Sequence, residues 1–164
     1  MARSIITGRF AKTEDTLREI AERLIYEMKQ ELTNDRRIAS GALLNSFGYS
    51  GIENLDLQIT SNVKYAGSVD RGYDGPEPSV SAIIRWAKLK NIRPTYRTGR
   101  NSGRPMSISQ FAKFTARKIG KYGYEGSDYV GKAFLRVSDL IERSIGESYA
   151  QDIEDMLEQN ITFK

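Results

Sequence analysis

The residues of this chain that could do chemistry are mainly cations, and they are concentrated in one segment. Residues 78–124 contain eleven Lys or Arg and no Asp or Glu, whereas the rest of the chain contains 14 basic and 21 acidic residues. The segment therefore carries +11 and its flanks carry −7, which gives the net charge of +4. Because charge separated in this way favours a partner of opposite sign, we expect the cations to face an outside partner or another copy of the chain.

Three of these cations lie in a loop over residues 95–105 that is rich in glycine, serine and arginine. Arg97, Arg100 and Arg104 recur there at spacings of three and four. Guanidinium groups form paired hydrogen bonds with phosphates and with carboxylates, so they could bind either. The glycines suggest a phosphate cradle, but the Gly-Lys-Ser/Thr ending of a P-loop is absent and no strand precedes the loop. We interpret it as a mobile connector whose arginines can reach a partner.

The composition removes the commonest catalytic and metal-binding side chains. The chain contains no His and no Cys, so it lacks imidazole bases, thiolate ligands and any Ser-His or Cys-His arrangement. A carboxylate-only metal site or an Asp/Glu acid–base pair is still possible, but no pair has a spacing that argues for one. We expect a protein that is not an enzyme and has no cofactor and no metal. A carboxylate-dependent enzyme is the third alternative, and a requirement for Mg²⁺ in a nuclease assay would support it.

The length and hydropathy predict one soluble domain. A chain of 164 residues fits a single domain, 1–164, with a core that needs no disulfides. No apolar run approaches the ~20 residues that span a bilayer. Residues 1–4 resemble neither a signal peptide nor a myristoylation site. We therefore expect synthesis in a cytoplasm and no membrane partner.

Two long amphipathic helices are expected near the ends of the chain, after an N-terminal arm over 1–12. The first, over 13–33, has Thr13 as its N-cap and an apolar stripe at spacings of three and four. The second, over 127–158, has an apolar stripe that begins at Phe134 and an acidic outer face. That face offers candidate carboxylates for contact between subunits: Glu142, Glu147, Asp152, Glu154, Asp155 and Glu158.

A small antiparallel sheet is expected in residues 40–72. Alternating apolar and polar residues over 55–60 predict a half-buried strand in which Leu55 and its alternate residues point inward. Residues 46–50 could form a second strand paired with it, and Ser40 could cap a short helix before that. Because so small a sheet cannot stand alone, the long helices are expected to cover its apolar face.

The basic segment is expected to be a helical insertion over 79–124. Ser79 caps a helix over 79–91, and a second helix follows over 107–122. The helical spacing places Phe114 in the core, so we expect most aromatic rings of the insertion to be buried. The candidate contacts for a partner or for DNA are Trp86, Lys88, Lys90, Arg93, Tyr96, Arg97, Arg100 and Arg104, with Tyr73 as a further apolar anchor.

Five short motifs occur in order along the chain: Ser-Gly-x-Leu-x-x-Ser at 40–46, Tyr-Ala-x-x-Val-Asp-x-Gly at 65–72, Ile-x-x-Trp at 83–86, Ala-x-x-Ile-x-x-x-Gly at 116–123, and the pair Phe134-Leu135. Together, in this order, they resemble the tail-completion (head–tail joining, or neck) proteins of tailed bacteriophages. Asp70 stands where that family usually has Glu, Ala133 stands where it usually has Pro, and the loop 95–105 has no family pattern. The resemblance covers about residues 13–157.

The resemblance implies an α+β fold and a structural function in the virion. The small antiparallel sheet would be packed by the N- and C-terminal helices. Such proteins form a homo-oligomeric ring, with sixfold symmetry favoured over twelvefold, between a portal-side connector or stopper protein and a tail tube or tail terminator protein. The ring is assembled in the bacterial host cytoplasm and leaves a channel that contacts genomic DNA only transiently and non-specifically.

The alternative hypothesis is a DNA- or RNA-binding protein that uses residues 85–121 as its contact surface. Cations interleaved with aromatic residues are typical of such surfaces. A nucleic-acid binder should lose affinity steeply as salt concentration rises, whereas a ring protein needs only weak contact with passing DNA.

Overall fold

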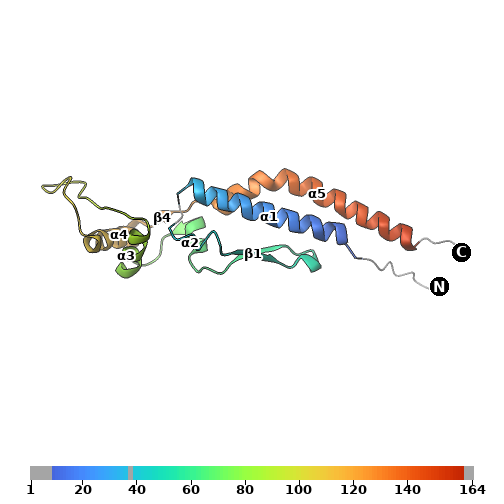
Figure 1. Ribbon diagram of the computed structural model, residues 1–164, viewed down its shortest axis with the longest axis horizontal. Helices are drawn as coiled ribbons and strands as arrows, with labels where there is room; N and C mark the ends of the chain where they lie inside the picture. The colour runs from blue at the N-terminus through green and yellow to red at the C-terminus, as the bar shows by residue number, and fades with distance from the viewer. Residues whose placement is uncertain (1–8, 37–38, 161–164) are drawn as a thin grey trace. The chain divides into compact units, whose positions relative to one another are not determined.

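The computed structural model describes residues 9–36 and 39–160, and the chain folds into two compact units (Figure 1). The expected α+β class is confirmed, because helices and short antiparallel strands occur in both units. Most of the expected N-terminal arm, residues 1–8, lies outside the described residues. Within the described residues, unit 1 comprises 9–31, 46–62 and 129–160, and unit 2 comprises 32–36, 39–45 and 63–128.

Unit 1 is built from two long helices and a β-hairpin. Helices α1 (Ala11–Asn34) and α5 (Tyr129–Asn160) lie side by side (Figure 1), and strands β1 (Phe47–Ser50) and β2 (Gln58–Ser61) pair antiparallel. The ring of Tyr129 lies 5.8 Å from that of Phe47, between centroids, so the helices contact the hairpin as expected. The buried apolar side chains of this unit include Leu17, Ile20, Met28, Ile52, Val137 and Met156.

The hairpin confirms the predicted pairing but begins its second strand later than predicted. A 3-10 turn over Ile52–Asn54 follows β1, and Leu55 closes it with a left-handed φ of 54°. Extended backbone cannot include a residue in that conformation, so β2 starts only at Gln58. The prediction that Leu55 points inward from a strand is therefore wrong, and its side chain is 37% exposed.

The start of α1 is capped by a side chain from α5. The first-turn N–H groups of Lys12 and Thr13 have no partner within the helix. Both donate to the carboxylate of Asp152, at 3.1 and 2.8 Å, and the Thr13 hydroxyl donates to the same group at 2.7 Å. Two predictions are thus wrong: Thr13 is not the N-cap, and Asp152 is buried rather than part of the outer acidic face.

This buried carboxylate remains ionised because of its donors. Burial alone would raise the pKa of Asp152, but the hydrogen bonds from Thr13 and Lys12 outweigh that effect and hold the pKa below its ordinary value. Two neighbouring contacts also hold the beginning of α1 against the end of α5. Phe10 stacks on Tyr149 with centroids 5.1 Å apart, and Lys12 pairs with Asp155 at 2.8 Å. Successive α5 residues three apart therefore hold the beginning of α1.

Farther along, α1 and α5 are joined by a partly buried ion-pair cluster. Arg136 of α5 pairs with both Glu27, at 3.3 Å, and Glu31, and Arg23 pairs with Glu27 at 2.8 Å. The two glutamates are buried although helical periodicity places them on the polar face. Because the start of α1 contacts the end of α5, while Glu31 contacts Arg136 near the start of α5, the two helices run antiparallel.

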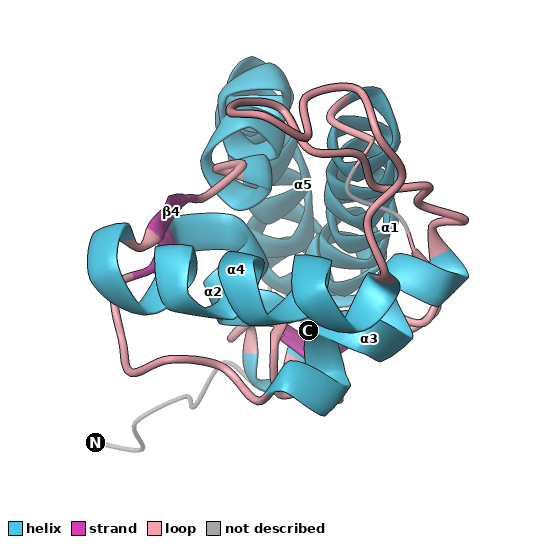
Figure 2. Cartoon of the chain, turned by 90° about the vertical axis from the view of Figure 1, so that its left-hand side faces the viewer, coloured by secondary structure: helices cyan, strands magenta, loops and turns pink. Residues whose placement is uncertain are grey.

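Unit 2 contains the basic insertion. Its elements are α2 (Ala66–Arg71), β3 (Gly72–Tyr73), α3 (Val80–Leu89), α4 (Ile108–Tyr122) and β4 (Tyr124–Glu125) (Figure 2). Helices α3 and α4 pack against each other, and strands β3 and β4 pair antiparallel. The predicted cap is confirmed, since the hydroxyl of Ser79 accepts from the N–H of Ala82, and Ser107 caps α4 in the same way.

Two local predictions in unit 2 are wrong. Residues 40–45 form turns rather than a short helix, because Gly41 adopts a left-handed φ of 74° directly after Ser40. The apolar alternation of residues 55–60 continues in phase at Val63 and Tyr65, which predicts a longer strand, but β2 ends at Ser61 and Tyr65 is the N-cap of helix α2. Helix α2 ends at Arg71, and its C-cap is Gly72, where φ is 93° and a Cβ would lie 2.5 Å from the carbonyl oxygen of Tyr124. Only glycine fits there, which explains the last position of the 65–72 motif physically.

Candidate functional site

The basic insertion carries its charge without internal compensation. Its eleven cations are exposed except Lys90, which is half-buried, and within the described residues none forms an ion pair with a carboxylate. The Lys90 ammonium donates to the carbonyl oxygen of Arg36 at 2.6 Å, and Lys121 lies over the ring of Tyr122. The eleven are Arg85, Lys88, Lys90, Arg93, Arg97, Arg100, Arg104, Lys113, Arg117, Lys118 and Lys121.

The loop between α3 and α4 is folded back on itself rather than irregular. Thr95 and Pro105 form an isolated antiparallel bridge, the N–H of Tyr96 donates to the Arg104 carbonyl at 3.0 Å, and the N–H of Gly103 donates to the Tyr96 carbonyl at 2.8 Å. The Tyr96 hydroxyl donates to the side chain of Gln110 at 3.1 Å, so this ring is half-buried and is held within the unit. The loop therefore presents arginines but no exposed aromatic anchor.

Helix α4 exposes aromatic rings among its cations. Phe114 is 53% exposed and Tyr122 is 70% exposed, so the prediction that Phe114 is a core residue is wrong. The residues of α4 that are fully buried are Ala112 and Ala116, which leaves Phe114 on the outward side. Phe114, Lys118 and Tyr122 are four residues apart and so share one face of the helix. Cations and aromatic rings therefore alternate on that face.

An apolar groove lies beside α3. Its volume is about 760 Å³, and its walls are formed by the turn segment 39–44, by α2, and by the facing sides of α3 and α4. Trp86 is 40% exposed and Leu89 is 52% exposed within it. Among the described residues, three cations line the groove, Arg36, Arg85 and Lys90, and no Asp or Glu does. The groove thus suits a ligand that is both apolar and acidic.

Among the predicted contact residues, only Trp86 and Lys90 line this groove. Lys88, Arg93 and the three loop arginines do not, so the structure does not gather the predicted contacts into one site. Leu89 and Arg85 were missed. The spacing of Ile83, Trp86 and Leu89, three residues apart, was the available signal for an apolar wall on one side of the helix.

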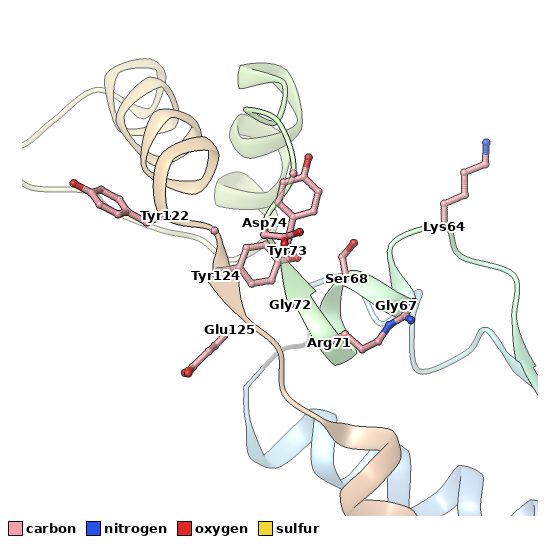
Figure 3. A pocket seen from close by; sticks show the side chains of 12 residues that line it. Lys64, Gly67, Ser68, Arg71, Gly72, Tyr73, Asp74, Tyr122, Tyr124 and Glu125 are labelled. Atoms are coloured by element: carbon pink, nitrogen blue, oxygen red, sulfur yellow. The ribbon is translucent and has the colours of Figure 1, made fainter.

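A second hollow in unit 2 is more polar and more open (Figure 3). Its volume is about 710 Å³. The side chains of Lys64, Tyr122 and Glu125 point away from one another, so they do not converge on one ligand position. Tyr73 is half-buried here, stacks on Tyr124 at 6.0 Å between centroids, and donates to the Pro76 carbonyl at 2.7 Å. The ring and hydroxyl of Tyr73, a predicted apolar anchor, are therefore both engaged within unit 2.

The acidic face of α5 survives in reduced form. Asp152 accepts hydrogen bonds from the first turn of α1, and Asp155 pairs with Lys12. The remaining carboxylates are exposed, and none of them takes part in an ion pair with another described residue. These four are Glu142, Glu147, Glu154 and Glu158.

No group of three acidic side chains in residues 9–36 and 39–160 could hold a metal ion. None of the helices in those ranges is long and apolar enough to cross a membrane. In comparisons with known proteins, no family model, no curated protein and no solved structure matches the chain.

Proposed function

We propose that this chain is a structural protein of the bacteriophage virion, in which identical copies form a ring at the head–tail junction. The ring would join a portal-side connector or stopper protein to a tail tube or tail terminator protein and leave a channel for DNA. The resemblance of the ordered motifs, from 40–46 to Phe134-Leu135, supports this assignment. The chain would act by assembly rather than by catalysis.

The observation that carries the proposal is that each unit exposes charge that the described residues do not neutralise. Unit 2 exposes many cations, and α5 of unit 1 exposes carboxylates that form no ion pair with another described residue: Asp139, Glu142, Glu147, Glu154 and Glu158. Exposed like charges within the Debye length of ~8 Å at physiological salt repel one another, so a surface of cations without counter-charge is unfavourable. A second copy that places its α5 carboxylates on this surface would relieve the repulsion.

Contact between unlike surfaces of identical copies is heterologous, and it closes into a ring when the rotation between copies permits. Complementary charge would set the register and speed of assembly more than its strength. The strength would come from apolar anchors, for which the exposed Trp86 and Leu89 are suited.

Native mass measurements across a salt series test the proposal. We expect an oligomer at physiological salt that dissociates well above it, because the charge pairing is screened. The double variant Glu142→Gln/Glu147→Gln should weaken the oligomer, whereas Glu19→Gln/Glu53→Gln, which removes the same charge elsewhere, should not. The charge-pairing proposal would be contradicted if the oligomer were equally stable in molar salt and if Glu142→Gln/Glu147→Gln assembled as well as the wild type.

The second candidate is nucleic-acid binding, which the alternating cations and aromatic rings of α4 favour. Base stacking on an exposed ring is worth about 1–3 kcal/mol per base. If this is the function, affinity for a labelled DNA oligonucleotide should fall steeply with salt, and Phe114→Ala should lower it about tenfold or more. Weak binding that does not respond to Phe114→Ala would leave the ring proposal as the better account.

A further inference from the structure

We infer that the apolar groove beside α3 binds the end of α5, residues 153–158, from a second copy of the chain. This inference deepens the ring proposal and rests on it, because it names the two surfaces through which neighbouring copies would join. The groove would therefore be filled when copies of the chain assemble, rather than by a small molecule.

The groove sets two requirements for its occupant. Its walls are apolar, with Trp86 and Leu89 left partly exposed, and its volume of about 760 Å³ can hold several side chains. In the part of the lining that the structure describes, Arg36, Arg85 and Lys90 have no carboxylate beside them. An occupant must therefore bring both apolar side chains and negative charge.

The end of α5 meets both requirements. Leu157 is 39% exposed, and the half-buried Ile153 lies one helical turn before it. Glu154 and Glu158 are exposed beside this pair. Apolar residues at helical spacing with flanking charges are the usual anchors of a helix that binds in a groove. The apolar pair would face Trp86 and Leu89, while the glutamates would face the groove cations.

Two other segments of the chain fit less well. Residues 1–9 carry Arg3 and Arg9, so they have the same sign of charge as the groove lining and would be repelled. The hairpin turn presents Leu55 between Glu53 and Asp56, which has the right charge. It offers one exposed apolar side chain, however, which is too little to fill the groove.

A mixing experiment tests the contact directly. Leu89→Asp should block the groove, and Leu157→Asp should block the helix end, so each variant alone should be monomeric. An equimolar mixture then contains one intact groove and one intact end, and it should form a heterodimer that grows no further. Native mass spectrometry distinguishes these species, and circular dichroism confirms that both variants are folded.

A charge exchange provides a test at exposed positions, where folding is not at risk. Arg85→Glu and Glu158→Arg should each weaken assembly about tenfold, and the double exchange should restore most of it, because the pair is then complementary again. Loss of fold or of general solubility would not be rescued in this way.

The outcomes separate this inference from the proposal on which it rests. If the wild type forms an oligomer and both Leu89→Asp and Leu157→Asp still form it, the inference is overturned but the ring proposal is not. An oligomer that is lost with Leu55→Asp and kept with Leu157→Asp assigns the groove to the hairpin and also overturns it. A wild-type chain that is monomeric overturns both.

Discussion

Replacing Asp152 by alanine removes the carboxylate that caps the first turn of α1. The side chain accepts three hydrogen bonds, from the N–H groups of Lys12 and Thr13 and from the Thr13 hydroxyl. Loss of an N-cap costs about 0.5–2 kcal/mol, and a buried donor left without a partner costs about 1–3 kcal/mol. The N–H of Lys12 is near solvent and can bind water, so we expect the free energy of unfolding to fall by about 3 kcal/mol.

Asp152 also makes the stability of the folded protein depend on pH. The pKa of Asp152 in the folded protein lies below its ordinary value, which is about 3.9 in an unfolded chain. A lowered pKa stabilises the folded state fully above the unfolded pKa, and this contribution is lost as pH falls through the folded pKa. The stability difference between the wild type and Asp152→Ala should therefore be constant from neutral pH to about pH 5 and shrink below about pH 4.

Urea denaturation followed by circular dichroism at fixed protein concentration measures both effects. Asp155→Ala is the matched control, because its pair with Lys12 is exposed and should contribute less than about 0.5 kcal/mol. Thr13→Val should cost about 1 kcal/mol in the wild type and close to nothing in Asp152→Ala, since the two act through one hydrogen bond. Equal effects of Asp152→Ala and Asp155→Ala would refute the capping role.

Three further predictions concern stability. Arg136→Met should lower the free energy of unfolding by about 2 kcal/mol, because two buried carboxylates lose the cation that they share. The loss is moderate because Arg136 is itself half exposed. The control is Arg143→Met, which removes an exposed cation of the same helix and should leave thermal unfolding as in the wild type. Gly72→Ala should cost at least about 2 kcal/mol from strain and overlap, whereas Gly146→Ala, which has open space within α5, should gain up to about 1 kcal/mol; a reversed order in urea would contradict the close approach. Phe114→Ser should change stability by less than about 0.5 kcal/mol, and a loss near 3 kcal/mol would mean that the ring is buried.

Much of the fold follows from signals that lie close together in the sequence. The apolar periods of α1 and α5 and the serine caps of the insertion helices depend on neighbouring residues within a turn or two. The hairpin pairing was also predicted, since alternation and a short connection fix it locally. These predictions required no knowledge of what packs where.

The errors arise where a distant partner decides. Thr13 is a residue type that is common at N-caps, but the carboxylate of Asp152, about 140 positions later, caps the helix instead. Phe114 matches a core position by period, but the close contact of α3 and α4 is made on the side of α4 that carries alanines. The groove was not predictable for the same reason, because its wall over 39–44 comes from a turn segment far from α3 in sequence.

The central claim is that identical copies of this chain close into a ring through unlike surfaces. The most direct test is the native mass of the wild-type protein across a wide concentration range at physiological salt. The proposal predicts one dominant species of fixed mass, a whole-number multiple of 18.5 kDa, with six copies favoured. A monomer at all concentrations, or a distribution that lengthens without limit as concentration rises, would contradict it.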